Sequence, residues 1–231
     1  MRYISIIPAR SGSKRVPKKN IAKIAGEPAL GITIRKLLSF NIFDIVYVST
    51  DSEEIATIAE NYGATAFPLR GAELSDDVTP SEVVIRNVII EQNLNLSNNL
   101  VCCVYPLSIL IRKQYLDEAI SLSANNNDRF IISGSRFETN PLRHSFTINN
   151  GCVNVVNPIY NSVRSQEVPD CYFDVGMFYV ARAKVWLDPS KYWYENNASI
   201  VNIPSEHAID VDTLSDLKKL ETLYLSQNYL A

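Results

Sequence analysis

The sequence predicts an α/β fold built on a doubly wound, mostly parallel sheet. Short apolar segments of strand length alternate with helical patterns along most of the chain, which is typical of a parallel sheet with right-handed crossovers. The segment 100–105 is continuously apolar, as expected of a strand covered by helices on both faces. Five cationic side chains follow the first predicted strand, and in such sheets ligands bind beyond the carboxyl ends of the strands.

The predicted strands share a length of four to eight residues and a mainly apolar composition. They are the segments 3–7, 45–49, 100–105, 130–133, 173–180 and 199–203. The first strand is reached directly from Met1 and stops at Pro8, which is too short for a secretory signal. We therefore expect a cytoplasmic protein.

The predicted helices carry apolar residues at helical spacing. They are the segments 28–40, 51–62, 79–92, 112–123 and 214–227. Asp51 is followed three residues later by Glu54, and Thr79 by Glu82, so Asp51 and Thr79 are predicted to cap their helices. Gly63 is expected to end the second helix.

The alternation of strands and helices stops between residues 139 and 174. This stretch is rich in Asn and aromatic residues and has a turn signal at 149–151. We interpret it as a small inserted lobe, such as a β-arm, within a single domain that spans residues 1–231.

The composition excludes several classes of protein. With 22 Lys and Arg against 25 Asp and Glu, the net charge is −3, so there is no basic excess for binding a nucleic acid backbone. The chain is 46% apolar and 20% charged, which excludes disorder. No apolar run reaches the length of a membrane span. The cysteines lack zinc-ligand spacing, and reduced, buried thiols are expected.

The most informative segment is 7–20, IPARSGSKRVPKKN, which follows the first strand. It has neither Walker A nor GxGxxG glycine spacing, so it would hold phosphate through cationic side chains and backbone N–H groups near Gly12. The alternative is a solvated surface loop. In an acidic chain, this density of positive charge at this topological position favours a polyphosphate site.

Asp210 and Asp212 are two residues apart near the carboxyl end. In an extended segment both carboxylates would face the same side and could share one Mg²⁺. The alternative is an acidic turn that caps the helix 214–227, and spacing alone does not decide between the two.

Four motifs in order resemble the acylneuraminate cytidylyltransferases, which make CMP-activated nonulosonic acids. The motifs are IPARSGSKRVPKKN at 7–20, VSTDSEEIA at 48–56, LRGAEL at 69–74 with Ser81, and IDVDT at 209–213 with Asp216. The resemblance covers nearly the whole chain and implies a nucleotide-diphospho-sugar transferase-like fold. It also implies attack of a nine-carbon sugar acid on the α-phosphorus of CTP, release of pyrophosphate, and Mg²⁺ as cofactor.

The resemblance also implies the roles of individual residues. Those expected at the nucleotide are Arg10, Ser13, Lys14, Lys19, Asn20, Arg70 and Ser81. Arg10 and Lys14 are expected to be catalytic, because fixed cations stabilise charge that develops on the leaving pyrophosphate. Asp210 and Asp212 would bind the metal. Ser81 could equally be an ordinary residue in the first turn of its helix.

The acceptor that the resemblance implies is a sugar acid, so its pocket should offer an Arg or an amide to a carboxylate. The residues expected there are Tyr105, Arg143, Arg164, Gln166, Asp174 and Phe178. Phe178 could equally occupy a core position of its strand. The inserted lobe is expected to pair with its twin in a homodimer and to help close the neighbouring site.

The acceptor motifs are closer to the pseudaminic acid branch than to the sialic acid branch. Residues 172–179, YFDVGMFY, carry Asp174 where sialic acid enzymes usually have Asn-Gly-Ala. The segment 107–110 and Met177 depart from the family pattern, so a CMP-sialic or CMP-legionaminic acid synthetase and a non-catalytic nucleotide-binding relative are alternatives. The isolated His144 and His207 are interpreted as structural, and no general base is predicted.

Overall fold

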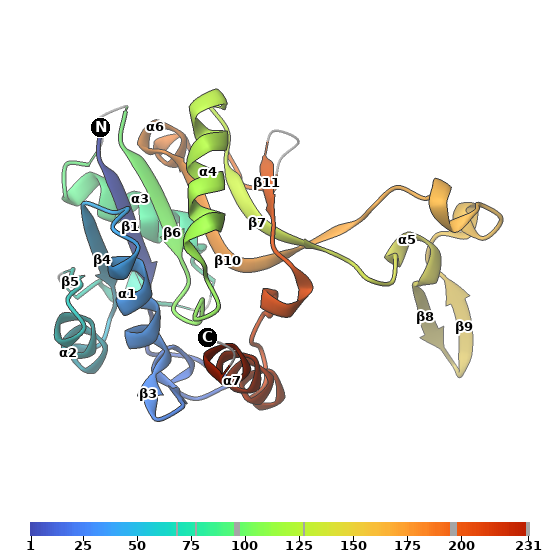
Figure 1. Ribbon diagram of the computed structural model, residues 1–231, viewed down its shortest axis with the longest axis horizontal. Helices are drawn as coiled ribbons and strands as arrows, with labels where there is room; N and C mark the ends of the chain where they lie inside the picture. Colours follow the sequence, from blue (N-terminus) through green and yellow to red (C-terminus); the bar gives the residue numbers. More distant parts are fainter. Residues whose placement is uncertain (68, 77, 95–97, 127, 195–197, 230–231) are drawn as a thin grey trace.

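A seven-stranded sheet forms the centre of the main body (Figure 1), with the strand order β11-β7-β10-β6-β1-β4-β5. The structure is a computed structural model that describes residues 1–231 except 68, 77, 95–97, 127, 195–197 and 230–231. The strands are β1 (Tyr3–Pro8), β4 (Ile45–Ser49), β5 (Thr65–Ala66), β6 (Leu100–Val104), β7 (Ile131–Arg136), β10 (Tyr172–Arg182) and β11 (Ser199–Asn202). Only β10 runs antiparallel to its neighbours among these described strands. The predicted fold class is confirmed.

Helices pack on both faces of the sheet. The helices of the main body are α1 (Ala29–Ser39), α2 (Glu53–Asn61), α3 (Ser81–Glu91), α4 (Lys113–Asn125), α6 (Ala183–Leu187) and α7 (Leu214–Tyr229), whereas α5 (Pro141–His144) lies between β7 and β10 and away from the sheet. In β6, Cys102 packs in the apolar cluster that contains α1, α2 and α4, whereas Cys103 packs in the cluster that contains α3 and α6. Neighbouring strand residues point to opposite faces, which explains the unbroken apolar run. A third cluster joins α7 to α1.

Cys102 and Cys103 are buried free thiols, and burial raises the pKa of each. Cys152 and Cys171 are also free, but Cys152 is exposed and Cys171 is half-buried. The expectation of reduced, buried thiols therefore holds for the adjacent pair. Among the helices that the structure describes, none combines the length and the apolar character needed to cross a bilayer.

Two predicted helix caps are wrong, because those side chains bind elsewhere. The residue that caps α2 is Ser52, whose hydroxyl accepts a backbone hydrogen bond at 3.4 Å. The Asp51 carboxylate instead accepts hydrogen bonds from Ser11. The Thr79 hydroxyl donates to the Glu73 carbonyl oxygen at 3.0 Å, and α3 has no side-chain cap.

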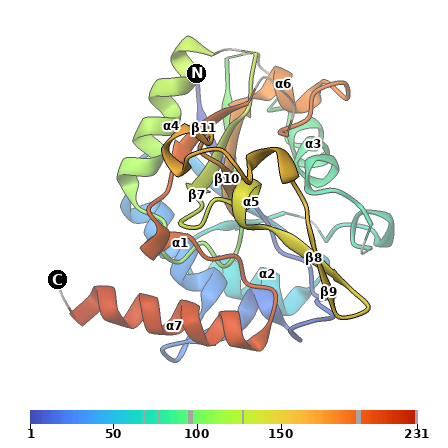
Figure 2. The same ribbon diagram turned by 90° about the vertical axis from the view of Figure 1, so that its right-hand side faces the viewer.

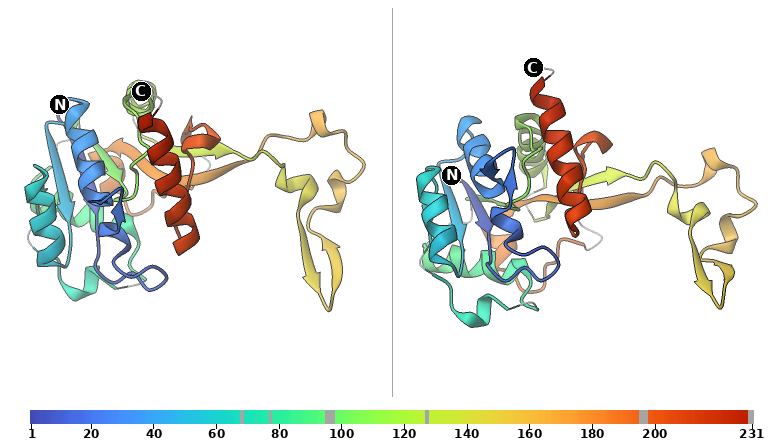
Figure 3. Two further views of the ribbon diagram at one scale, coloured as in Figure 1. Left: turned by 60° about the horizontal axis from the view of Figure 1, so that its bottom comes forward. Right: turned by 90° about the horizontal axis from the view of Figure 1, so that it is seen from below.

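Residues 137–171, between β7 and β10, form an arm that leaves the main body (Figures 1 and 2). It carries α5 and an antiparallel hairpin of β8 (Phe146–Asn149) and β9 (Cys152–Val155). All residues of both strands are exposed, and the two views of Figure 3 show the hairpin standing apart from the body. The arm corresponds to the predicted inserted lobe. A second small hairpin, β2 (Lys23–Ile24) with β3 (Glu27–Pro28), had no clear sequence signal.

Gly63 ends α2 as predicted. Its φ is +88°, its N–H donates to the Glu60 carbonyl oxygen at 2.9 Å, and the Ala64 N–H donates to the Ala59 carbonyl oxygen at 3.0 Å. This pair of bonds is the Schellman arrangement, which satisfies the last carbonyl groups of a helix with a left-handed residue. The left-handed conformation therefore favours glycine here.

Gly63→Ala should lower the free energy of unfolding by about 1–2 kcal/mol, because a Cβ makes the left-handed conformation unfavourable. Gly63→Asn should lower it less, since Asn tolerates this conformation better. Equilibrium urea denaturation measures both. Gly12→Ala is the control, because a Cβ added at Gly12 meets no atom within 4 Å. Equal losses at Gly63 and Gly12 would contradict the role given to Gly63.

Candidate functional site

Two adjoining cavities lie at the edge of the sheet where β1 and β6 end. The chain continues from these neighbouring strands in different directions, and such a switch point is where open α/β sheets bind ligands. We call the first the basic cavity, of about 280 Å³, because Arg10, Lys14, Arg15, Lys19 and Arg70 line it.

The second cavity, of about 360 Å³, is lined by Tyr105, Tyr179 and Tyr194, and we call it the tyrosine cavity. Lys19, Asn20 and Tyr105 line both cavities. The two spaces therefore meet at a shared wall, as a site for two substrates would require.

The basic loop, residues 9–20, is fixed to the start of α2. Asp51 accepts hydrogen bonds from the Ser11 backbone N–H at 2.7 Å and from the Ser11 hydroxyl at 2.8 Å. Lys18 pairs with Glu54 of α2 at 2.7 Å. Asn20 donates from its side chain to the Arg10 carbonyl oxygen at 2.8 Å and so closes the loop on itself. The loop is therefore held by defined bonds, unlike a freely solvated segment.

Arg70 is a buried cation in the basic cavity. The residue is only 8% exposed, and its Nε has no hydrogen-bond partner within the described part of the chain. Burial and the nearby charge of Arg10 lower the pKa of Arg70, while Asp51 raises it. A buried hydrogen-bond donor left without a partner is costly, so the Nε of Arg70 is suited to a hydrogen-bond acceptor on a bound ligand.

The two predicted hydroxyl contacts, Ser13 and Ser81, also line the basic cavity. Ser81 is the first residue of α3 and accepts a hydrogen bond from the Tyr105 hydroxyl at 2.8 Å. Burial raises the pKa of Tyr105, which keeps this hydroxyl protonated as a donor. All seven residues predicted at the nucleotide thus line one cavity.

Asp210 and Asp212 lie on either side of the junction of the cavities. Asp210 lines the tyrosine cavity, whereas Asp212 lines the basic cavity and pairs with Arg15 at 2.6 Å and Lys19 at 3.7 Å. Partial burial and the charge of Asp212 raise the pKa of Asp210. The two carboxylates are thus close enough to repel each other, and a divalent cation would relieve that repulsion.

This carboxylate pair fits Mg²⁺, which usually binds one or two carboxylates and completes its shell with water and phosphate oxygens. Within the described residues, no three His, Cys, Asp or Glu side chains converge as a complete protein cage. Asp216 does not belong to this pair, because it accepts hydrogen bonds from the backbone and hydroxyl of Thr213 at the start of α7.

Asp174, which was predicted to contact the sugar acid, lines the tyrosine cavity and accepts three hydrogen bonds there. One oxygen of its carboxylate, Oδ2, accepts from the hydroxyls of Tyr179 at 2.5 Å and Tyr194 at 2.7 Å. The other, Oδ1, accepts from the Gly176 N–H at 2.9 Å. Tyr179 and Tyr194 were not predicted at the site.

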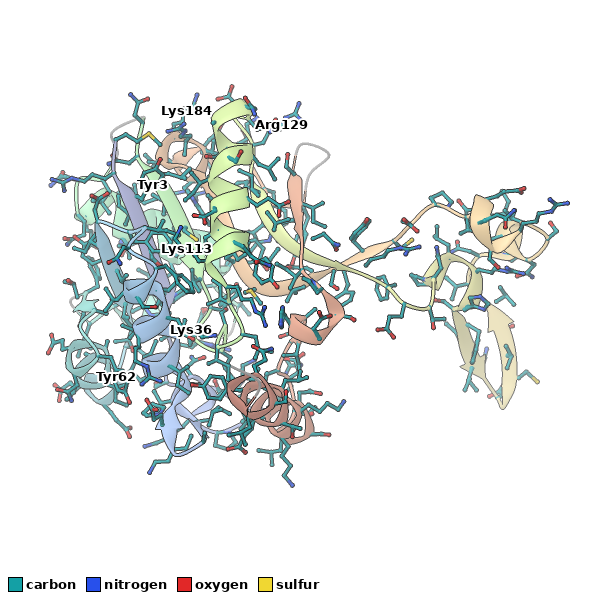
Figure 4. All side chains as sticks on the ribbon, viewed as in Figure 1. Tyr3, Lys36, Tyr62, Lys113, Arg129 and Lys184 are labelled. Atoms are coloured by element: carbon teal, nitrogen blue, oxygen red, sulfur yellow. The ribbon has the colours of Figure 1, made fainter. Side chains whose placement is uncertain are left out.

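The turn at 107–110, which departs from the family pattern, contributes to the tyrosine cavity and is held by α1. Thr33 donates to the Pro106 carbonyl oxygen at 2.8 Å. Lys36, labelled in Figure 4, donates to the carbonyl oxygens of Ile109 at 2.6 Å and Ile111 at 3.3 Å. Burial, followed by the charge of Arg112, lowers the pKa of Lys36 to about 8.

His207 also lines the tyrosine cavity, although sequence reasoning set it aside as structural. It is 4% exposed, and its Nδ1 shares a hydrogen bond with the Tyr115 hydroxyl. Burial and the charge of Arg112 lower its pKa, which favours the neutral imidazole. No local sequence signal could have revealed the contact, because Tyr115 lies 92 residues away.

Four other predicted acceptor residues are not brought into the tyrosine cavity of the same chain. Phe178 is fully buried in the core, so the structure places it at the alternative position, in the strand interior. Arg143, Arg164 and Gln166 lie on the arm, and the Arg143 guanidinium donates to the Ser165 hydroxyl. The arm leaves the main body (Figure 1), and these three residues are not among those that line either cavity.

A family profile described as cytidylyltransferase matches residues 4–164. The chain is 36% identical to the pseudaminic acid cytidylyltransferase of Campylobacter jejuni subsp. jejuni serotype O:2, with 97% of each chain covered. It is 27% identical to the CMP-N,N'-diacetyllegionaminic acid synthase of Legionella pneumophila subsp. pneumophila, with 96% of each chain covered.

A solved structure of CMP:2-keto-3-deoxy-manno-octonic acid synthetase complexed with CTP matches with a TM-score of 0.72. The two chains are 17% identical, and the match covers 98% of this chain and 100% of the other. At this identity the likeness supports the fold alone. The sequence matches, together with the four motifs gathered at one sheet edge, confirm the predicted family: this chain belongs to the cytidylyltransferases.

Proposed function

We propose that this protein transfers a cytidylyl group from CTP to a nonulosonic acid, with pseudaminic acid as the preferred acceptor, and releases pyrophosphate. The observation that carries the proposal is the junction of two cavities at Lys19, Asn20 and Tyr105. One cavity has the cations that a triphosphate needs, and the other has the polar groups that a sugar acid needs. The relatives named above carry out reactions of this class.

The basic cavity would hold the triphosphate. Arg10 and Lys14 lie on the fixed basic loop, so their charges need little reorganisation when negative charge develops on the leaving pyrophosphate. The unpartnered Nε of Arg70 would meet an acceptor atom of the nucleotide. Positioning and neutralisation of charge are the main requirements of such transfers.

Asp210 and Asp212 would hold Mg²⁺ at the junction of the cavities. When bound, the ion would neutralise phosphate charge and help to orient the two substrates. Asp212 pairs with Arg15 and Lys19 without the ion, and this pairing keeps its carboxylate at the junction. The repulsion that raises the pKa of Asp210 would be relieved on binding.

The assignment of pseudaminic acid is supported by the relatives. Identity is 36% to the pseudaminic acid enzyme and 27% to the diacetyllegionaminic acid enzyme, over nearly the whole chain in both cases. Asp174 is central to the tyrosine cavity, at the position where sialic acid enzymes usually have Asn. The cysteine usage agrees with action in the cytoplasm, where CTP is available.

We also propose that the protein is a homodimer held by the arm. Phe146 is paired with Val155, and Ile148 with Val153, so these four residues share one face of the β8–β9 hairpin. They are between 40% and 71% exposed. An isolated two-stranded hairpin is marginally stable, and an exposed apolar face of this kind is typical of a protein interface.

The dimer would also give a role to the predicted acceptor residues of the arm. Arg143, Arg164 and Gln166 lie on the arm, which stands apart from the body (Figure 3), and they do not line the cavities of their own chain. In a dimer the arm would extend toward the other subunit, where two arginines could meet the carboxylate of the acceptor.

Pyrophosphate release with CTP and Mg²⁺ should be fastest with pseudaminic acid in a panel that includes legionaminic and N-acetylneuraminic acids. Lys14→Ala should lower kcat/KM by about 100-fold, because a fixed cation at the leaving group is lost. Lys23→Ala, which removes an exposed lysine outside both cavities, should have no effect. CTP binding without release with any acid would instead favour a non-catalytic protein.

Asp210→Asn should abolish Mg²⁺-dependent turnover and yet stabilise the ligand-free fold. Its raised pKa means that the ionised carboxylate disfavours folding at every pH above that pKa, and an amide removes this cost. Asp216→Asn should destabilise the fold and leave Mg²⁺-dependent turnover intact. Hydrogen bonds from Thr213 lower the pKa of Asp216, so its ionised form favours folding. Urea denaturation at pH 7 and turnover against Mg²⁺ concentration measure both variants. Full activity of Asp210→Asn would remove Asp210 from the metal site.

Ile148→Asp should shift the protein from dimer to monomer in sedimentation velocity at micromolar concentration, because a charge on the apolar hairpin face opposes its burial. Asn154→Asp adds the same charge on the other face of the hairpin and should leave the dimer intact. A monomeric wild-type protein would end the proposal of an arm-mediated dimer.

A further inference from the structure

The tyrosine cavity contains a carboxylate, Asp174, that the transfer reaction itself does not require. Building on the proposed function, we propose that Asp174 binds an acylamino N–H group of the sugar-acid acceptor. Tyr194 is then a positioning residue that acts through Asp174. The inference deepens the proposed function, since it names the chemical group that this cavity selects.

The backbone of β10 is irregular where it carries Asp174. The register against β7 shifts between Asp174 and Tyr179, and Gly176 lies between them with a φ of +63°. The Ser133 hydroxyl oxygen of β7 accepts hydrogen bonds from two backbone N–H groups of this bulge, at 3.0 and 3.1 Å. Bulges of this kind next to active sites redirect side chains, and here Asp174 and Tyr179 line the same cavity.

The hydrogen bonds of Asp174 leave room for one ligand group. An ionised carboxylate can accept about four hydrogen bonds. Tyr179 and Tyr194 fill Oδ2, and the Gly176 N–H takes one position on Oδ1. Within the described part of the chain, the remaining position on Oδ1 has no protein donor. Because Asp174 lines the cavity, a ligand there can supply that donor.

The bonds from the tyrosines also fix the direction of the carboxylate. Burial raises the pKa of Tyr179 and of Tyr194, and the charge of Asp174 raises both further, so both hydroxyls stay protonated donors. Tyr179 stacks on Trp193 with ring centroids 4.0 Å apart, which holds the first donor in place. Tyr194 is 58% exposed at the cavity wall, so this second donor can be removed without disturbing the core.

The ligand group that meets Asp174 must be a donor, because an ionised carboxylate only accepts. The negative charge of Asp174 repels the carboxylate of the acceptor from this wall of the cavity. One relative is named for an N,N'-diacetyl acid, which carries amide N–H groups. An amide N–H is satisfied by one contact with Asp174, whereas a hydroxyl is both a donor and an acceptor and Asp174 meets only its donor.

The decisive experiment compares pseudaminic acid with two analogues in which one acylamino N–H is replaced by an ester oxygen. For the wild-type enzyme, KM for one analogue should rise by about 10- to 100-fold, the effect of losing a hydrogen bond to a charged group. In Asp174→Ala, KM for pseudaminic acid should already be raised. The ester analogue should then have the same KM as pseudaminic acid. Such coupling between a ligand atom and a side chain indicates direct contact.

Tyr194→Phe tests the positioning role with little risk to folding. KM for pseudaminic acid should rise about 3- to 10-fold, because the Asp174 carboxylate loses one of the hydrogen bonds that fix its direction. KM for CTP should stay unchanged. Tyr192→Phe is the matched control, because Tyr192 is a similarly exposed tyrosine two residues away that does not line the cavity. Equal effects of the two substitutions, or a rise in both KM values, would overturn the role of Tyr194.

The outcomes separate this inference from the proposed function. If the wild-type protein releases no pyrophosphate with any acid, the proposed function fails. If it is active and the ester analogues are penalised equally in wild type and Asp174→Ala, the Asp174 inference fails alone. A third analogue, in which one hydroxyl of the acid is replaced by hydrogen, tests the alternative contact. If its higher KM disappears in Asp174→Ala while the effect of the ester analogues remains, Asp174 binds a hydroxyl and the choice of an N–H group is overturned.

Discussion

The site depends on the attachment of the basic loop to the start of α2. Five positive side chains within eleven residues repel one another, and an unattached loop would spread them into solvent. Asp51 binds both the backbone and the hydroxyl of Ser11, and its charge also favours the buried cation of Arg70. One carboxylate thus anchors the loop and offsets part of the cost of the cations around it. The nucleotide's own charge would supply the rest.

The sequence predicted six of the seven described strands of the central sheet, all except the two-residue β5, and it predicted residues that line the basic cavity, because both depend on local patterns. Alternating apolar segments defined the strands, and the basic loop stood out by charge and position. Asp51 shows the limit of such patterns: its spacing to Glu54 fits a helix cap, but its carboxylate binds Ser11 of the basic loop instead. Competition between two satisfactory partners is decided by three-dimensional position, which spacing does not contain.

The acceptor side was harder to predict, because it is built from a bulge and from long-range contacts. In a regular strand, residues an odd number of positions apart face opposite sides, so Asp174 and Tyr179 would not share a cavity. The bulge in β10 brings them together and leaves Phe178 in the core. His207 is held by Tyr115 from another element. Neither arrangement has a signature within a short window of sequence.

The two halves of the site also divide along the chain. The family profile spans residues 4–164, and the residues that line the basic cavity lie within it except for Asp212. The tyrosine cavity draws Asp174, Tyr194 and His207 from beyond the profile. A shared nucleotide imposes the same charges on every member, whereas acceptors differ in their polar groups. Specificity can therefore change through β10 and the segments after it while the bonds that hold the basic loop stay the same.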